Sequence, residues 1–222
     1  LLLTVVVPVW IVPLFYRLHP LEDAALKERL LELARRVGVA VIGAWVADQS
    51  RKSRTANAAL TGLANTRRII LFDTLITEFT SDEIESVLAH ELGHHVHGDV
   101  RRGLFVQGAV LLTTLWVADY LLRLGSVHFG YQGPADPAGL PLLALILLLL
   151  GLIAAPLANG FSRRIERQAD DFALTTTGNS GAFISAMERL AKLNLAERRP
   201  NRLKEFFLYS HPSIDRRIEM AK

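Results

Sequence analysis

The sequence contains no cysteine, so disulfide bonds and thiolate metal sites are excluded. Any metal that the chain binds must therefore be held by His, Asp or Glu side chains. The sequence also lacks an interleaved pattern of aromatic and basic residues, and its net charge is only +3, so we expect no nucleic-acid partner. It has no internal repeat and no low-complexity linker, and 222 residues are enough for one good-sized domain or two small ones.

Long apolar runs, in contrast, are abundant, and half of the residues are hydrophobic although 21% are charged. This mixture predicts a polar domain joined to membrane spans. The runs are Leu1 to Leu18, Leu104 to Leu124 and Leu140 to Asn159. About 20 apolar residues cross the hydrocarbon core of a bilayer, so we expect both the third and the second run to span it. For the second run, a buried core helix is the alternative. Asp119 and Arg123 in the second run are four residues apart, so they can pair on one helix face.

The chain opens inside the first run and without a Met, so we expect residues 1–18 to be the end of a transmembrane segment in a longer protein with further spans upstream. The second and third runs predict a transmembrane hairpin over residues 104–160. Its connecting loop, Gly125 to Gly139, has no Lys or Arg, whereas the opposite ends carry Arg101, Arg102, Arg163, Arg164 and Arg167. Basic residues stay on the cytoplasmic side of a membrane. The sequence therefore predicts a multi-pass membrane protein whose polar regions, residues 19–103 and 161–222, are cytoplasmic.

The polar regions predict a small domain that is mainly α with a small β-sheet. Apolar spacing and helix-ending glycines indicate helices at Leu21 to Val37, Ser162 to Thr177 and Gly181 to Ala196. Runs rich in β-branched and aromatic residues indicate strands at Val39 to Val46 and Arg68 to Phe72, and Ala56 to Leu63 is a further strand candidate. A fourth helix begins at Thr80, because Thr80 and Glu83 have the spacing of a capping box.

The helix that begins at Thr80 carries the segment His90-Glu91-Leu92-Gly93-His94. Residues four apart share a helix face, so both imidazoles can be aimed at one ion. Glu91 lies beside that face, where its carboxylate can reach a metal-bound water. This spacing is the signature of zinc metalloproteases. A chance match to so short a pattern is the alternative, but the capped helix and a downstream third ligand argue against it.

The candidate for that third ligand is Glu166. Catalytic zinc sites have three protein ligands and a water, and two His with one Glu is a known set. Glu166 and Asp170 are one helical turn apart, so Glu166 can bind the metal while Asp170 accepts a hydrogen bond from a ligand imidazole. Without the two histidines, a solvated helix face would be the simpler interpretation of these acids. His211, which precedes Pro212, is a candidate donor to a developing oxyanion.

Together these segments resemble the type I CAAX prenyl endopeptidase family, also described as Ste-type or HtpX-like membrane zinc peptidases. The resemblance covers residues 20–222. It rests on Leu21-Glu22-Asp23, Asn57-Ala58-Ala59-Leu60-Thr61-Gly62-Leu63, Arg68-Ile69-Ile70-Leu71-Phe72-Asp73-Thr74-Leu75, the His90–His94 motif, Glu166 to Asp170, and His211-Pro212. It implies a gluzincin-type peptidase domain that is interrupted by a transmembrane hairpin.

The resemblance also implies roles for individual residues. The counterpart of Glu166 is the third zinc ligand, and the counterpart of Asp170 supports the site. The position matching Asn57 contacts the backbone of the substrate. The positions matching His211 and Arg217 stabilise the transition state or the substrate.

The sequence thus predicts an integral-membrane endopeptidase with one Zn²⁺ per chain, which hydrolyses peptide bonds of prenylated or membrane-associated protein chains at the lipid bilayer. A quality-control metalloprotease for membrane proteins is the alternative within this class. A non-catalytic zinc-bound membrane scaffold is the alternative outside it, and Glu91 argues against a scaffold because a structural site needs no base. An ion transporter would need polar ligands inside the spans, whereas the expected ligands lie outside them.

Overall fold

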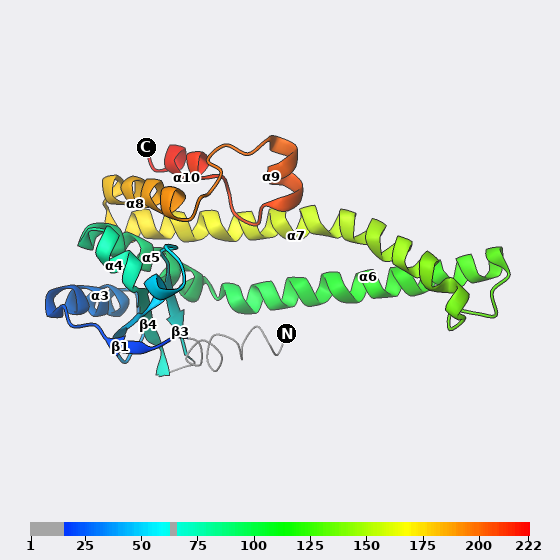
Figure 1. Ribbon diagram of the computed structural model, residues 1–222, viewed down its shortest axis with the longest axis horizontal. Helices are drawn as coiled ribbons and strands as arrows, with labels where there is room; N and C mark the ends of the chain where they lie inside the picture. Colours follow the sequence, from blue (N-terminus) through cyan, green and yellow to red (C-terminus); the bar gives the residue numbers. More distant parts are fainter. Residues whose placement is uncertain (1–15, 63–65) are drawn as a thin grey trace. The chain divides into compact units, whose positions relative to one another are not determined.

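The computed structural model describes residues 16–62 and 66–222 (Figure 1). The predicted transmembrane end at residues 1–18 lies almost wholly outside the described residues. The chain divides into two compact units. The first unit comprises the described part of residues 1–100 together with residues 165–200 and 212–222, and the second comprises residues 101–164 and 201–211.

The first unit contains a four-stranded mixed sheet with the order β1-β2-β4-β3. Its strands are β1 (Leu18–Pro20), β2 (Ala44–Ala47), β3 (Ala58–Thr61) and β4 (Arg68–Phe72). β2 pairs with β4 in parallel, and the other two pairings are antiparallel. In the described part of the sheet β3 is an edge strand, since it pairs only with β4.

The predicted strand at Arg68 to Phe72 is confirmed, but the other two predicted strands are shorter than expected. β2 begins only at Ala44, because the N–H of Val39 donates to Ala34 O (2.9 Å) and so ties this stretch to the preceding helix. β3 ends at Thr61, because the positive φ of Gly62 (103°) breaks the extended backbone. The short strand β1 had no clear signal in the sequence.

Helices α3 (Ala24–Arg36) and α5 (Ser81–His97) pack in the core of the first unit. α3 begins later than predicted because the side chain of Asp23 accepts a hydrogen bond from Leu26 N (2.9 Å) and caps the helix. The capping box at the start of α5 is confirmed, since Thr80 N donates to Glu83 Oε2 (2.7 Å) and Glu83 N donates to Thr80 Oγ1 (3.3 Å). These caps fix where each helix starts.

The remaining helices of the first unit complete the core. They are α4 (Asp73–Glu78), α8 (Ser180–Leu193) and α10 (Ile214–Met220), with a 3₁₀ turn, η2, at Gln49–Arg51. Ile84, Leu88 and Leu92 form the apolar stripe of α5, and with Phe183 of α8 they are almost fully buried. The predicted fold class, mainly α with a small β-sheet, is confirmed.

Two long helices, α6 (Asp99–Phe129) and α7 (Leu140–Thr177), contain the second and third apolar runs. Both are long and apolar enough to cross a membrane, by length and composition. Only 6% of the most apolar window of α6 is buried among the described residues, so α6 does not pack as a core helix within them. Arg123 Nε donates to Asp119 Oδ2 (2.8 Å), as the spacing predicts.

The third apolar run and the predicted helix at Ser162 to Thr177 are parts of one helix, α7, although Pro156 lies inside it. The second unit also contains a 3₁₀ turn, η4 (Pro137–Gly139), and the short helix α9 (Arg202–Leu208). Ala118 and Leu122 of α6 pack with Ile146 of α7, which gives the hairpin a small core of its own.

Candidate metal centre

The structure brings the three predicted metal ligands together. One potential ligand atom from each of His90, His94 and Glu166 lies within 4.8 Å of the others. The two Nε2 atoms are 3.1 Å apart, and the carboxylate oxygens of Glu166 lie 3.4 Å from His90 Nε2 and 3.6 Å from His94 Nε2. Ligands at the corners of a zinc tetrahedron with bonds of about 2.0–2.1 Å are separated by about 3.3 Å. The spacing of the donor atoms therefore fits a single ion of this size.

Gly93 explains how Glu166 comes this close to helix α5. A Cβ atom at Gly93 would lie 3.2 Å from Ala169 Cα and 3.1 Å from the ring of Phe172, both on α7. The backbone of α7 therefore approaches α5 closely at Gly93. Because the backbone of α7 is so near, the short side chain of Glu166 can reach the two imidazoles on α5.

Each ligand imidazole is held by its own aspartate. Asp170 Oδ1 lies 2.8 Å from His90 Nδ1, as predicted, and Asp170 is fully buried. Asp99 Oδ2 lies 3.0 Å from His94 Nδ1, and Asp99 is also buried. Such carboxylates fix the tautomer and the orientation of a metal-binding histidine.

Asp99 was missed by the sequence analysis. On an uninterrupted helix it would point about 140° away from His94, because five residues make about 500° of rotation. The structure ends α5 at Gly98, whose left-handed conformation (φ 67°) turns the chain so that Asp99 folds back onto the ring of His94. The available signal was an acidic residue directly after a helix-ending glycine.

The tautomers imposed by the two aspartates favour a bound cation. If each Nδ1 carries the proton that it donates to its carboxylate, each Nε2 presents a lone pair. Two lone pairs that face each other across 3.1 Å repel unless a cation or a shared proton lies between them. Buried His90 and half-buried His94, with the Glu166 carboxylate beside both Nε2 atoms, therefore fit a divalent metal ion.

The pKa of His90 shows how strongly this cluster attracts positive charge. Burial by itself would lower the pKa of His90, but the hydrogen bonds to Asp170 and Glu166 outweigh it and raise the pKa to about 9. A metal ion that binds here must therefore compete with protons for this imidazole.

Arg217 of α10 has a structural contact that the sequence analysis did not anticipate. Its Nε donates to Asp170 Oδ2 (2.8 Å), and its Nη2 donates to the other oxygen of the same carboxylate. Burial by itself would raise the pKa of Asp170, but the hydrogen bonds with His90 and Arg217 hold it below its usual value. Arg217 thus keeps Asp170 charged and oriented, while its predicted contact with substrate stays a prediction.

Glu91 lies beside the ligands on the same helix, and it is half-buried. Burial raises the pKa of Glu91, the neighbouring His90 and His94 oppose this, and the negative charge of Glu166 adds to it. A carboxylate with a raised pKa accepts a proton more readily near neutral pH. This is the property that a general base requires.

The remaining predicted site residues stay predictions. Asn57 is exposed just before β3, and its side-chain oxygen accepts a hydrogen bond from Ala58 N (2.9 Å). Its backbone oxygen accepts from Phe72 N (3.0 Å), which anchors the start of the edge strand. His211 belongs to the second unit, where its Nδ1 lies 2.9 Å from Ser210 Oγ.

Comparisons with known proteins agree with this site. The sequence model of Peptidase family M48 matches residues 20–222. The uncharacterized metalloprotease YhfN of Bacillus subtilis (strain 168) is 34% identical over 219 residues, which cover 97% of this chain and 51% of that protein. CAAX prenyl protease 1 of Saccharomyces cerevisiae is 32% identical over 235 residues, which cover 96% of this chain and 51% of that protein.

A similar fold is found in the crystal structure of Ste24p from S. mikatae, with a TM-score of 0.85 and 30% sequence identity, over 100% of this chain and 55% of that chain. This chain spans about half the length of the curated relatives that it matches. The predicted resemblance is confirmed by the family match and by these relatives. The chain therefore belongs to peptidase family M48.

Proposed function

We propose that the chain forms the catalytic part of an integral-membrane zinc endopeptidase. The observation that carries this proposal is the convergence of His90, His94 and Glu166, with a separate aspartate on each imidazole and with Glu91 beside them. These three side chains would hold a zinc ion, which would supply a Lewis acid able to make a water molecule a better nucleophile near neutral pH. A purely structural site has no use for the carboxylate of Glu91.

The residues of the chain then have distinct roles in peptide hydrolysis. Glu91 accepts the proton of the attacking water and passes it to the leaving amine, since its raised pKa suits both steps. His211 donates a hydrogen bond to the oxyanion, and Arg217 assists while it holds Asp170. The open edge of β3, beginning next to Asn57, pairs with an extended substrate through backbone hydrogen bonds.

The membrane part of the proposal rests on α6 and α7. We propose that their apolar runs form a transmembrane hairpin at residues 104–160, with the loop that lacks Lys and Arg outside and the catalytic regions at residues 19–103 and 161–222 in the cytoplasm. The exposed apolar side chains of both helices support this, because such a surface is stable only in lipid or against further spans.

For the substrate we propose protein chains that are prenylated or otherwise associated with the membrane. The yeast relative is named CAAX prenyl protease 1, and this name supports a prenylated substrate. Cleavage of damaged membrane proteins is the competing function. The two functions differ in whether a lipid attached to the substrate increases the rate of cleavage.

The test is a peptidase assay on the purified chain in lipid nanodiscs, together with measurement of bound zinc. A farnesylated peptide is compared with its unmodified twin, with and without a chelator. We expect one zinc per chain, loss of cleavage on chelation and faster cleavage of the farnesylated peptide. Equal rates for the two peptides would support the quality-control function, and cleavage that survives complete zinc removal would refute the metallopeptidase.

Glu91→Gln provides the sharpest control for the mechanism. The variant keeps its shape and its distance from the ligands, but its amide cannot accept the proton of the water. We expect zinc content to remain unchanged and cleavage to fall by about 10²–10⁴-fold or more. A zinc-loaded, inactive variant would support the role of Glu91 as base, whereas a fully active one would rule it out.

A further inference from the structure

Helix α9 has its polar and apolar faces reversed relative to a helix in water. Glu205 is buried (4% exposed), whereas Leu203, Phe206, Phe207 and Leu208 are exposed at 70%, 50%, 40% and 71%. Leu203, Phe206 and Phe207 follow the i, i+3, i+4 spacing of one helix face, and Glu205 lies opposite to it. A surface helix in water buries its apolar stripe, so this arrangement indicates apolar surroundings on the outer side of α9. We call the side chains of Leu203, Phe206 and Phe207 the α9 apolar face, whereas Leu208 is exposed on another side of the helix.

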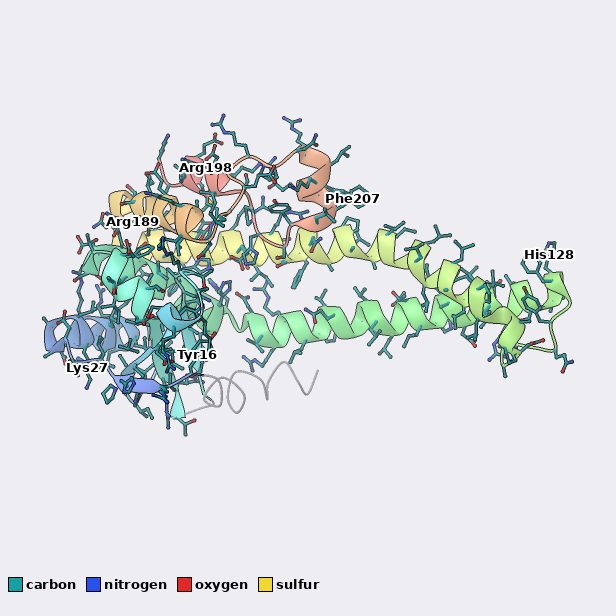
Figure 2. The ribbon with its side chains drawn as sticks, in the orientation of Figure 1. Tyr16, Lys27, His128, Arg189, Arg198 and Phe207 are labelled. Atoms are coloured by element: carbon teal, nitrogen blue, oxygen red, sulfur yellow. The ribbon has the colours of Figure 1, made fainter. Side chains whose placement is uncertain are left out.

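Hydrogen bonds fix α9 at one level of helix α7, within the second unit. Asn159 Nδ2 donates to Phe207 O (2.7 Å), and Arg163 Nη1 donates to Glu205 O (3.0 Å) and to Tyr209 O (2.6 Å). Figure 2 shows Phe207 on α9 beside this part of α7. Asn159 and Arg163 are the first polar and the first charged residues after the apolar run of α7. The level of attachment is therefore the level at which α7 changes from apolar to polar.

The residues around the α9 apolar face match the boundary between acyl chains and headgroups. Arg202 and Lys204 lie on the same short helix, and Arg163 and Arg164 lie on α7. The ammonium group of Lys204 lies 5.8 Å from the centre of the Tyr209 ring. Aromatic residues and basic residues gather at such boundaries, where the rings and aliphatic stems reach the acyl chains and the charges reach the headgroups.

We infer that α9 is an interfacial membrane helix, whose apolar face inserts into the lipid beside the cytoplasmic end of the α7 span. The inference rests on the proposed transmembrane hairpin, because the apolar run of α7 sets the depth of α9. The lipid surface is favoured as the occupant because Ile153 and Leu157 of α7, exposed at 63% and 67%, lie within two helical turns of Asn159, which binds α9, and because basic residues lie on both helices. α9 thus holds the second unit at a fixed depth in the membrane.

The absence of cysteine makes a direct test simple, because single cysteines can be introduced and labelled with a fluorophore. Leu203→Cys and Phe207→Cys place the label on the α9 apolar face. Leu149→Cys, on the exposed apolar surface of α7, is the control inside the span, and Lys27→Cys on α3 is the control in water. The full chain is reconstituted in vesicles of phosphatidylcholine and phosphatidylglycerol, with lipids that carry a nitroxide quencher near the headgroup or near the chain end, and iodide serves as the aqueous quencher.

We expect both α9 labels to lose emission with the headgroup-proximal lipid quencher, several-fold more than the label at Lys27, and to be shielded from iodide. The label at Leu149 should respond to the lipid quenchers as well. Quenching of the α9 labels by iodide alone would overturn the inference, and so would shielding from every quencher, which would indicate a protein partner. If Leu149 responds and α9 does not, only the inference fails. If neither responds to lipid, the transmembrane hairpin fails with it.

Discussion

At the scale of single residues, the site depends on two aspartates that contact the ligand imidazoles at Nδ1. Asp170 was found from its spacing to Glu166 on one helix, which periodicity reveals. Asp99 was not found, because its contact with His94 depends on the left-handed turn at Gly98 between two helices. Contacts within a regular element follow from the sequence, whereas a contact across a chain reversal depends on the backbone conformation at one residue.

The contribution of Asp99 can be measured through metal affinity. Asp99→Ala removes the acceptor of the His94 N–H, so the ring is free to rotate and to change tautomer. We expect zinc to bind about 10–100-fold more weakly, measured by competition with a chromophoric chelator. Asp99→Asn, which keeps one oxygen acceptor, should lose less.

Asp171→Ala is the matched control, because Asp171 is an exposed aspartate next to Asp170. Its zinc affinity should equal that of the unmodified chain. Asp99 also lies in the first turn of α6, so a purely structural role would lower the melting temperature without a specific loss of zinc affinity. That result would contradict the positioning role.

At the scale of elements, the close packing of α5 against α7 sets the distance between the ligands. Gly93→Ala would place a methyl group 3.1–3.2 Å from Phe172 and from the backbone of Ala169. The backbone of α7 must then move away from α5 and carry Glu166 with it. We expect a loss of about 1–3 kcal/mol in unfolding free energy and weaker zinc binding.

Gly103→Ala on α6 is the control for Gly93→Ala, because an added Cβ there meets no atom within 4 Å. It should be neutral or slightly stabilising, since alanine favours helix. Thermal unfolding and zinc titration of both variants check this prediction. Unchanged zinc affinity in Gly93→Ala would show that the α5–α7 distance does not control the site.

The start of α5 is held by Glu83, which is buried and links α5 to α8. It accepts hydrogen bonds from Thr80 N, from the hydroxyl of Ser185 and from Arg189 Nε (2.9 Å). Burial by itself would raise the pKa of Glu83, but these three hydrogen bonds hold it below the ordinary value of 4.5. The ionised form therefore stabilises the folded state above pH 4.5, and this contribution is lost as the pH falls through the lowered folded-state pKa.

Because the ionised carboxylate of Glu83 stabilises the folded state, we expect Glu83→Gln to lose about 1–3 kcal/mol of unfolding free energy at pH 7. The difference from the unmodified chain should shrink as the pH falls below 4.5. Glu32→Gln, which removes an exposed partner of Arg35, should change stability by about 0–1 kcal/mol at either pH. If the loss of unfolding free energy in Glu83→Gln did not depend on pH, the negative charge of Glu83 would not be the source of the stabilisation.

Element prediction succeeded where a local signal was strong and failed where tertiary contacts decide. The capping box at Thr80 and the apolar strand at Arg68 to Phe72 gave correct starts and types. The sequences of the short strand β1 and the helix α4 show no pattern of apolar residues that predicts them. β1 is defined by its pairing with β2, and α4 by its packing in the fold. α7 was divided in the prediction because its composition changes near Ser162, although nothing there breaks the helix.

At the scale of the whole molecule, the long helices join the two parts of the sequence. α7 has 38 residues, which correspond to about 57 Å of helix, whereas a bilayer core is about 30 Å thick. The same helix therefore contains an apolar run long enough to span and, beyond it, the ligand Glu166. A hairpin can be inserted between the two histidines and the third ligand because α5 and α7 pack closely at Gly93 and Ala169. The sequence motifs predicted the ligands, but only the folded chain shows that they meet.

The central claim is that one metal ion is held by His90, His94 and Glu166, and zinc X-ray absorption of the purified chain tests it most directly. We predict one zinc per chain, with the multiple-scattering pattern of two imidazoles and light-atom bonds of about 2.0–2.1 Å. Glu166→Ala should keep the imidazole pattern and bind zinc more weakly. A spectrum without imidazole scattering, or zinc binding that survives His90→Ala and His94→Ala together, would contradict the account.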